Sequence, residues 1–336
     1  MTRVNEVLDR AAWDGEVNAL GGHPLQLWGW GEVKGMGEWT PRRLRVTSQD
    51  GAPLGLAQVL VRRLPAPFKA LSYVPRGPVV APDGTGADVA RREVAEAVVE
   101  WCRAHLGGVG VSFEPAWAEG VALGVAGARR ARNTILYPST LILDLEREPD
   151  ALLADMRKST RYEIRKAQRE GLVVRRVTGE DEVRAVLGVY HETARRAGFA
   201  LHDDEYYLAV HRELGEASRL VAAFDEDGQP CCFAWAATSS STAFLLYGGA
   251  NDAGRRLRAT APVYWASITD ARELGVGAYD LNGLLNDGIG EFKRSFAKHE
   301  DQLAGTWDVP LNAALHTAWE RGLPTAKKVV RRLRGR

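Results

Sequence analysis

Six cationic side chains fall within fourteen residues, from Met156 to Arg169, in a chain whose formal net charge is only +1. Because charges elsewhere in the chain balance, this local excess is typical of a surface placed for an anionic partner, and phosphate is the natural candidate. A solvated helix face is the alternative explanation. The segment therefore predicts either a phosphate-binding surface or an exposed polar helix.

The spacing of this segment predicts one helix between Pro149 and Gly171. A proline in the first turn and a glycine after the last turn are typical of helix boundaries. One expected stripe is apolar and consists of Leu152, Leu153, Met156, Ile164 and Ala167. A second expected stripe is cationic and consists of Lys158, Arg161, Arg165 and Arg169. Neighbouring like charges repel by about 0.2–0.5 kcal/mol per pair, so a ligand or the nearby Glu163 and Glu170 must relieve them.

Length and composition limit the class of protein. A chain of 336 residues forms one large or two medium domains. Hydrophobic residues at 45% and charged residues at 26% are typical of a globular protein. No window holds the roughly 18 apolar residues that a membrane span needs, and the N-terminal sequence lacks the apolar core of an export signal. We therefore expect a cytoplasmic protein.

The three cysteines and seven histidines do not show metal-binding spacing. Cys231 and Cys232 are adjacent, which is a poor arrangement for a disulfide, and Cys102 lies in an expected helix. All three are expected to be buried thiols. Because no Cys-x-x-Cys or His-Glu-x-x-His pair occurs, we expect no metal site and no cofactor.

The last ten residues are strongly basic. Their cations are Lys327, Lys328, Arg331, Arg332, Arg334 and Arg336. The apolar residues between them are Val329, Val330 and Leu333. This pattern predicts a short amphipathic helix that rests on anionic lipid or RNA, with a frayed solubilising tail as the alternative.

Hydrophobic periodicity predicts two successive α/β units. The first has expected strands at 42–46, 54–61, 71–74, 109–113 and 140–145, and an expected helix at 87–106. The second has expected strands at 172–176, 219–224, 230–238, 241–247 and 278–281, and expected helices at 180–196, 204–214 and 261–274. Helices mixed with hairpins, such as the turn at Asp225–Gly228, favour a mixed α/β or α+β fold over a pure doubly wound sheet.

Two glycine-rich stretches could bind a ligand. Gly248 and Gly249 follow Tyr247 at a strand end, which predicts either a close approach of backbone amides to a ligand or a tight turn. The basic residues that follow, 255–260, lack the glycines of an acetyl-coenzyme A pyrophosphate loop. Further along, Lys293 lies beside a glycine-rich loop, where a lysine can fix a phosphate or an oxyanion. A surface lysine is the alternative.

The order of these motifs resembles the FemABX family of peptidoglycan interpeptide-bridge aminoacyltransferases. The motifs are Ile164-Arg165-Lys166-Ala167-x-Arg169-x-Gly171, Gly198-Phe199 leading to Tyr206, Tyr247-Gly248-Gly249, Tyr279-Asp280-Leu281-x-Gly283, Phe292-Lys293 and Gly305-Thr306-Trp307-Asp308. The runs 26–34 and 73–78 fit the same family. The resemblance therefore covers almost the whole chain.

The resemblance implies two acetyltransferase-like (GNAT-like) domains that flank a substrate cleft, in the compact form without a helical arm. The expected divisions are 1–145, 146–312 and a basic C-terminal helix at 313–336 that packs back on the first domain. The implied reaction moves glycine or another small residue from aminoacyl-tRNA to the side-chain amine of a UDP-linked or lipid-linked muropeptide precursor. The implied protein is a cytoplasmic monomer with peripheral contact to the inner membrane surface.

The resemblance also implies roles for individual residues. Lys293 is the expected stabiliser of the oxyanion or a phosphate, and Glu114 is the expected acceptor of the amine proton. The expected precursor-binding residues are Lys34, Trp28, Arg76, His202, Tyr206, Tyr247 and Phe292. The expected tRNA phosphate contacts are Lys158, Arg161, Arg165 and Lys166. His202 departs from the family, since relatives often have arginine there and histidine is only partly charged near pH 7.

Two other functions are compatible with the sequence. One is an acyl-coenzyme A-dependent N-acyltransferase of the wider GNAT superfamily, which tight coenzyme A binding would support. The other is a noncatalytic protein that binds RNA or a membrane through the basic helix and tail. In that case, neutralising Arg161, Arg165 and Lys166 abolishes all activity, whereas Lys293→Ala has no effect.

Overall fold

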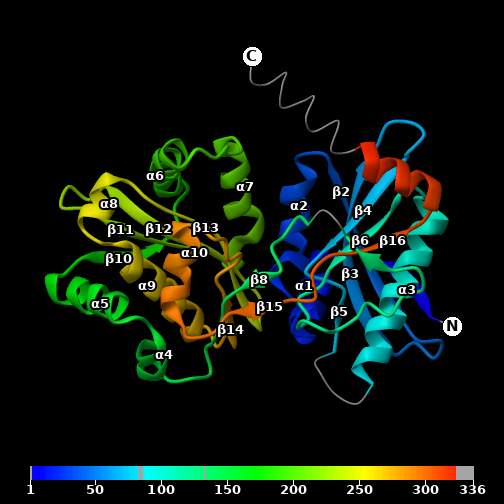
Figure 1. Cartoon of the computed structure of the whole chain (residues 1–336), viewed down its shortest axis with the longest axis horizontal. Helices are drawn as coiled ribbons and strands as arrows, with labels where there is room; N and C mark the ends of the chain where they lie inside the picture. The colour runs from blue at the N-terminus through cyan, green and yellow to red at the C-terminus, as the bar shows by residue number, and fades with distance from the viewer. Residues whose placement is uncertain (1, 82–85, 132–133, 323–336) are drawn as a thin grey trace. The chain divides into compact units, whose positions relative to one another are not determined.

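The computed structural model describes residues 2–81, 86–131 and 134–322 (Figure 1). The basic segment at 327–336, for which the sequence predicts an amphipathic helix, lies outside the described residues. Contacts divide the chain into two compact units. Unit 1 contains the chain up to Trp13, Lys34–Leu136 and the chain from Ala304, and unit 2 contains Asp14–Val33 and Tyr137–Leu303. The divisions expected at 145 and 312 are contiguous and do not include this exchange of residues 14–33.

Unit 1 is built on an eight-stranded mixed sheet with the order β1-β2-β3-β4-β6-β16-β7, and β5 also pairs with β3. The strands are β1 (Arg3–Glu6), β2 (Trp39–Thr47), β3 (Pro53–Arg63), β4 (Ala70–Pro75), β5 (Val79–Val80), β6 (Gly110–Glu114), β7 (Arg129–Arg130) and β16 (Trp307–Pro310). Among these strands, β4 and β6 run parallel, and the other neighbours run antiparallel.

The core of unit 1 lies between this sheet and α3 (Ala87–His105). Val98 and Cys102 of α3 pack in one cluster with Val59 and Val111 of the sheet. Every second residue of a strand faces the same side, so β3 and β6 present a continuous apolar surface to the helix. Burial raises the pKa of the Cys102 thiol to about 12, which agrees with the predicted buried thiol.

The end of the described chain belongs to unit 1. Residues 313–322 are helical. Trp319 packs edge-on against Phe68, with ring centroids 5.4 Å apart, and Glu320 lies 3.6 Å from the Arg129 guanidinium. Within the part of the chain that the structure describes, no helix is long and apolar enough to cross a lipid bilayer.

Unit 2 contains a six-stranded sheet with the order β10-β11-β12-β13-β14-β9 and a short two-stranded sheet, β15-β8. The strands are β8 (Ser139–Thr140), β9 (Ile142–Asp144), β10 (Val173–Val177), β11 (Ser218–Phe224), β12 (Pro230–Thr238), β13 (Thr242–Ala250), β14 (Ala278–Asp280) and β15 (Asp301–Gln302). β13 and β14 run parallel. The predicted hairpin turn is confirmed, because the Asp225 N–H donates to the Gln229 carbonyl and Gly228 has a φ of +73°.

Helices cover both faces of the large sheet (Figure 1). They are α4 (Pro149–Asp155), α5 (Lys158–Glu170), α6 (Glu180–Ala197), α7 (Asp204–Leu214), η2 (Gly215–Ala217), α8 (Asp252–Arg256), α9 (Thr260–Glu273), α10 (Gly288–Lys293) and η3 (Arg294–Phe296). Val263 of α9 packs in a cluster with Ala234 of β12, whereas Tyr190 of α6 packs on the preceding strand residue, Phe233. Consecutive strand residues point to opposite faces, so α6 and α9 lie on opposite sides.

Two N-terminal helices, α1 (Arg10–Ala19) and α2 (Trp28–Gly35), contain residues of both units, and a short turn, η1 (Pro24–Gln26), lies between them. The sequence analysis did not assign them as helices. Gly29 allows α2 to begin against the end of α7, because a Cβ at this position would lie 2.0 Å from the Glu213 carbonyl oxygen.

Candidate active site

The parallel pairing of β13 and β14 ends at Phe244 and Asp280, and the candidate site lies just beyond. In α/β sheets, ligands bind outside the carboxyl ends of parallel strands. Immediately after β14, Asn282 and Gly283 have φ angles of +52° and +63° and turn their carbonyls towards α10. The Nζ of Lys293 donates hydrogen bonds to the carbonyl of Asn282 and to that of Gly283, the latter at 3.1 Å. The structure therefore holds the predicted catalytic lysine on the predicted glycine-rich loop.

Lys293 is buried, with only 9% of its surface exposed. Burial lowers the pKa of its ammonium to about 8, while the charges of Asp280 and Asp287 act in the opposite direction. An ammonium has three N–H donors, and the two loop carbonyls accept two of them. The arrangement thus leaves one donor for a ligand oxygen and keeps the group close to its titration point at physiological pH.

Asn282 holds the loop in place through its N–H and its side-chain amide. Its N–H donates to Oδ1 of Asp280 at 2.7 Å, and its side-chain amide donates to the Leu245 carbonyl at 3.1 Å. The same Asp280 oxygen accepts the Thr140 hydroxyl. Sequence reasoning quoted Asp280 as part of a motif but missed this supporting role for Thr140, Asp280 and Asn282. The sequence signal for this role is Asn282 before Gly283 at the end of a strand, and such a pair is too common in proteins to be specific.

Phe292 helps to fix α10 in the core of unit 2. Its ring meets Tyr264 edge-on at 5.0 Å and Phe296 at 5.3 Å between centroids. It is partly buried. These contacts support a positioning role for Phe292 next to Lys293, and its predicted contact with a precursor stays a prediction.

An aromatic cluster surrounds the predicted precursor-binding tyrosines of unit 2. The His202 ring stacks on Tyr206 with centroids 4.0 Å apart, and Tyr207 meets both Tyr206 and Tyr247 edge-on, at 5.4 and 5.1 Å. Burial, followed by the charge of Tyr206 and a hydrogen bond with it, raises the pKa of the Tyr247 hydroxyl well above its ordinary value. The structure therefore brings the three predicted residues together in one aromatic cluster.

The same strand carries this cluster and the lysine loop. Asn282 bonds to the carbonyl of Leu245, two residues before Tyr247 on β13. Leu245 and Tyr247 pair with consecutive residues of β12, Ala236 and Trp235, because a bulge separates them, so their side chains face opposite sides of the sheet. The Lys293 loop and the aromatic cluster are thus both attached to β13.

The glycine pair after Tyr247 has a packing role that the sequence analysis did not predict. Gly248 and Gly249 lie inside β13, paired with β12, so the predicted tight turn is wrong. A Cβ at Gly248 would lie 2.6 Å from the Tyr264 hydroxyl, and one at Gly249 would lie 2.6 Å from Oγ1 of Thr193. The glycines therefore allow α9 and α6 to pack closely on the strand, and this packing fills the space expected for a ligand.

The predicted single basic helix is two helices, α4 and α5, with a break at Met156 and Arg157. Gly171 ends α5 as predicted, with a φ of +72°. The Arg161 guanidinium donates to the carbonyls of Met156 and, at 3.2 Å, Ala154. Arg161 therefore caps the end of α4, and its side chain does not belong to the exposed cationic stripe predicted for it.

The other cations of α5 differ in their surroundings. Lys166 lies 3.6 Å from Glu170, whereas Lys158, Arg165 and Arg169 are exposed. The start of α5 is joined to the segment that follows Lys293. The Arg157 N–H donates to the Ser295 carbonyl at 2.8 Å, and the Thr160 hydroxyl donates to that of Ser295 at 2.8 Å. The structure thus places the basic helix beside the lysine-bearing segment.

Glu114 is a fully engaged buried carboxylate in unit 1, with 1% of its surface exposed. It accepts the hydroxyls of Tyr73 and Thr306 and the N–H groups of Ile135, at 2.7 Å, and Leu136. Burial, and then the charge of Glu114, raises the pKa of the Tyr73 hydroxyl well above its ordinary value. These four bonds give Glu114 a structural role, and its predicted role as proton acceptor stays a prediction.

Arg76 follows the last residue of the parallel pair β4 and β6, so it has the same topological place in unit 1 that the lysine loop has in unit 2. It is 3% exposed and has a φ of +50°. Lys34 is partly exposed in the last turn of α2, and Trp28 is partly buried at its start. The predicted contacts of all three residues with a precursor stay predictions.

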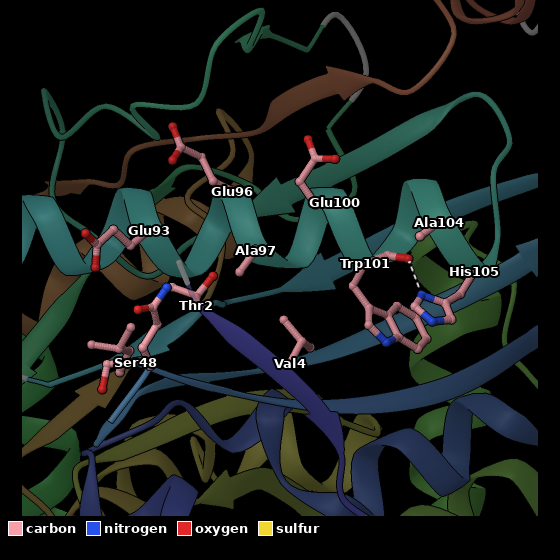
Figure 2. A pocket seen from close by; sticks show the side chains of 12 residues that line it. Thr2, Val4, Ser48, Glu93, Glu96, Ala97, Glu100, Trp101, Ala104 and His105 are labelled. Atoms are coloured by element: carbon pink, nitrogen blue, oxygen red, sulfur yellow. Dashed lines mark hydrogen bonds between the residues drawn. The ribbon is translucent and has the colours of Figure 1, made fainter. Parts of the chain in front are cut away.

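A groove of 870 Å³ in unit 1 lies away from these residues (Figure 2). Its lining includes Val4, Leu54 and Trp101, and Figure 2 shows Glu93, Glu96 and Glu100 on α3. The predicted site residues do not line it. Its carboxylates make it unsuitable for a polyphosphate, so we do not assign the reaction to it.

One group of residues in the described part of unit 1, Asp308, His316 and Glu320, has the chemistry of metal ligands. The Arg129 guanidinium lies 2.6 Å from Nδ1 of His316 and 3.6 Å from Glu320. The Arg129 guanidinium therefore already supplies positive charge beside the carboxylates of Asp308 and Glu320. The group is therefore an ion-pair network that connects the final described helix to β16 and β7.

Comparison with known proteins shows what the chain is similar to. A model of the acetyltransferase (GNAT) domain matches residues 154–294, within unit 2. The chain is 22% identical over 391 residues to the lipid II:glycine glycyltransferase of Staphylococcus aureus (strain USA300), and the match covers 91% of this chain and 92% of that protein. The crystal structure of FemX superposes with a TM-score of 0.82 at 19% identity, covering 94% of this chain and 99% of that one. The chain is thus similar to FemX-type proteins along almost its whole length.

A second solved structure supports the fold assignment. A tandem GNAT protein from the clavulanic acid biosynthesis pathway has a TM-score of 0.52 and 13% identity, over 93% of this chain and 99% of that one. The predicted mixed α/β fold with GNAT-like domains and the predicted resemblance to the FemABX family are thereby confirmed. The similarity to a glycyltransferase and to the GNAT domain supports a transferase of acyl or aminoacyl groups.

Proposed function

We propose that this protein transfers an amino acid, glycine or another small residue, from aminoacyl-tRNA to the side-chain amine of a peptidoglycan precursor and so forms the interpeptide bridge. The observation that carries this proposal is Lys293, held as a buried donor by the Asn282 and Gly283 carbonyls. The match to lipid II:glycine glycyltransferases along 91% of the chain supports a lipid-linked acceptor. We propose that the protein acts as a monomer at the cytoplasmic membrane surface.

The chemistry needs positioning and charge stabilisation more than a covalent intermediate, because an aminoacyl ester is already activated. The neutral amine attacks the ester carbonyl, and the N–C bond forms as the carbonyl oxygen gains negative charge. The third N–H of Lys293 stabilises that oxygen. The ester C–O bond then breaks, and the proton lost by the amine ends on the ribose oxygen that leaves. The aromatic cluster of His202, Tyr206 and Tyr247 binds the acceptor.

The basic helix supports a tRNA donor. α5 begins against Ser295, two residues after Lys293, and carries exposed Lys158 and Arg165. Phosphate contacts from these side chains would hold the donor close to the catalytic lysine. In this proposal, Arg161 holds the break between α4 and α5 through its bond to the Met156 carbonyl. Lys166, which is paired with Glu170, adds positive charge to the same helix.

A coenzyme A thioester is a less favoured donor. Where a pyrophosphate loop would follow β13, Asn251 accepts the Gly254 N–H at 3.0 Å, and a Cβ at Gly254 would lie 2.2 Å from the Cys231 carbonyl oxygen. The amide and the glycine at this turn therefore serve internal packing.

The acceptor can be tested directly. Purified protein and glycyl-tRNA are incubated with a lipid-linked precursor in detergent micelles or with its UDP-linked form, and the products are analysed by mass spectrometry. We expect one added residue on the stem-peptide side-chain amine of the lipid-linked form. Modification of neither precursor by glycyl-, seryl- or alanyl-tRNA would reject the proposal.

A further inference from the structure

The exposed face of α5 carries a regular stripe, the α5 stripe, made of Lys158, Tyr162, Arg165 and Arg169. The steps of four, three and four residues place these side chains on one face of the helix over about 16 Å. All four are exposed, and 53% of the Tyr162 surface is accessible. The opposite face, with Thr160, Ile164 and Ala167, is buried. The packing of α5 therefore fixes which residues face outwards.

The cations of the α5 stripe are not neutralised by the protein. In residues 2–81, 86–131 and 134–322, the ion pairs of α5 are those of Lys166 with Glu170 and of Glu163 with Arg258. Arg161 is used by α4. Arg165 and Arg169 are one turn apart and repel each other, and the Tyr162 ring lies exposed to water between Lys158 and Arg165, which favours an anionic partner with a flat apolar surface.

A single-stranded nucleic acid has both features. Its phosphates bind cations, and its unstacked bases stack on an aromatic ring. In a duplex the base faces are stacked on one another, so an exposed tyrosine on the stripe would find no partner. The helix that carries the stripe packs on the lysine segment through its buried face, by Thr160 with Ser295, and Arg157 just before the helix lies 3.2 Å from Glu291.

We propose that the α5 stripe binds the unpaired end of the donor RNA, with a base stacked on Tyr162 and phosphates held by Lys158, Arg165 and Arg169. This inference rests on the proposed function. It adds Tyr162 as a binding residue and specifies that the bound part of the RNA is single-stranded, neither of which the sequence suggested. The stripe orients the RNA so that its aminoacylated end leads towards Lys293.

The test measures binding of a fluorescent single-stranded oligoribonucleotide to the full-length chain, with the duplex of the same strand as the comparison. Tyr162→Ala is expected to weaken single-strand binding about 5- to 150-fold, and Tyr162→Phe to retain it. Arg165→Gln and Arg169→Gln are each expected to reduce the salt slope by about 0.7. Arg195→Gln, which removes one exposed charge from α6, is the matched control and should have little effect.

Equal affinity for single strand and duplex, or unchanged binding by Tyr162→Ala, would overturn the inference. Binding of the stripe to anionic phosphatidylglycerol vesicles in preference to RNA would also overturn it. The transfer assay separates this failure from that of the proposed function. If glycyl-tRNA donates its amino acid but Tyr162→Ala leaves the KM for tRNA unchanged, only the α5 stripe is wrong, whereas an absence of transfer rejects the function itself.

Discussion

At the scale of single residues, the site depends on how Lys293 is held. The Asn282 and Gly283 carbonyls accept two of its N–H groups, and the remaining donor is the group that the proposed reaction uses. Asn282 is itself fixed by Asp280 and by the Leu245 carbonyl. The lysine is therefore preorganised before a substrate arrives, which is the condition under which a donor stabilises a transition state best.

Replacing Lys293 tests this role. Lys293→Ala is expected to lower kcat about 10²- to 10³-fold, because the oxyanion loses its donor. Lys298→Ala is the matched control, since Lys298 is exposed and lies 2.9 Å from Asp155. Circular dichroism verifies that both variants fold. Equal turnover by Lys293→Ala and the native protein would remove Lys293 from the mechanism.

The pH dependence of the reaction follows from the lowered pKa of Lys293, about 8. The acceptor amine must be neutral, so kcat/KM rises with pH, but the charged form of Lys293 is lost above pH 8. We expect log kcat/KM to rise with unit slope below about pH 8 and to level off above it. In Lys293→Arg the cation persists, and the rise should continue. A native profile that rises through pH 9 without a break would contradict a charged Lys293.

The lowered pKa of Lys293 also determines in which direction the free energy of unfolding changes with pH. Between pH 8 and the ordinary value of 10.5, the folded protein binds fewer protons at Lys293 than the unfolded chain does. The contribution of this group to the free energy of unfolding therefore increases as the pH rises through that window.

At the scale of elements, close packing on β13 explains two glycines. Gly249→Ala would place a Cβ 2.6 Å from Oγ1 of Thr193 and 3.0 Å from Phe233. We expect it to lower the free energy of unfolding by about 1–3 kcal/mol in urea titrations. Gly188→Ala, on α6 with open space around it, should raise it by about 0.4–1 kcal/mol. An unchanged stability for Gly249→Ala combined with weaker substrate binding would restore the ligand-approach interpretation.

Local signals were sufficient to predict most elements. The bounds of α7 and β12 coincide with the predicted 204–214 and 230–238. Asp203 caps α7 by accepting the Tyr206 N–H at 2.9 Å, and Gly228 closes the turn before β12, so both limits are set by neighbouring residues. The break between α4 and α5 was missed because it depends on Ser295, far along the chain, whose carbonyl accepts the Arg157 N–H.

The candidate site was predictable only in outline. The sequence placed Lys293 beside a glycine-rich loop, but the left-handed turn at Asn282, which presents the accepting carbonyl, has no distinct sequence signal. The predicted cationic stripe was wrong at Arg161. The bonds of Arg161 to the α4 carbonyls require the break between α4 and α5, which the sequence did not predict. Tyr162 takes its place on the exposed face.

At the scale of the whole molecule, each unit contains one parallel strand pair with polar residues at its carboxyl end. In unit 1 the pair ends at Pro75 and Glu114 and is followed by Arg76. In unit 2 it ends at Phe244 and Asp280 and is followed by Asn282. The repetition of this arrangement fits the tandem GNAT-like fold. Sequence pattern revealed the two units but not the exchange of residues 14–33, which local periodicity does not encode.

The most direct test of the central proposal is the choice of donor. Radiolabelled glycine, serine and alanine are offered to the purified protein on their cognate tRNAs, with glycyl- and acetyl-coenzyme A as comparison donors and a lipid-linked precursor as acceptor. We predict label on the side-chain amine of the precursor only with charged tRNA, and loss of that label with Lys293→Ala. Label transferred from a thioester but not from tRNA would contradict the proposal and assign the protein to the coenzyme A-dependent acyltransferases.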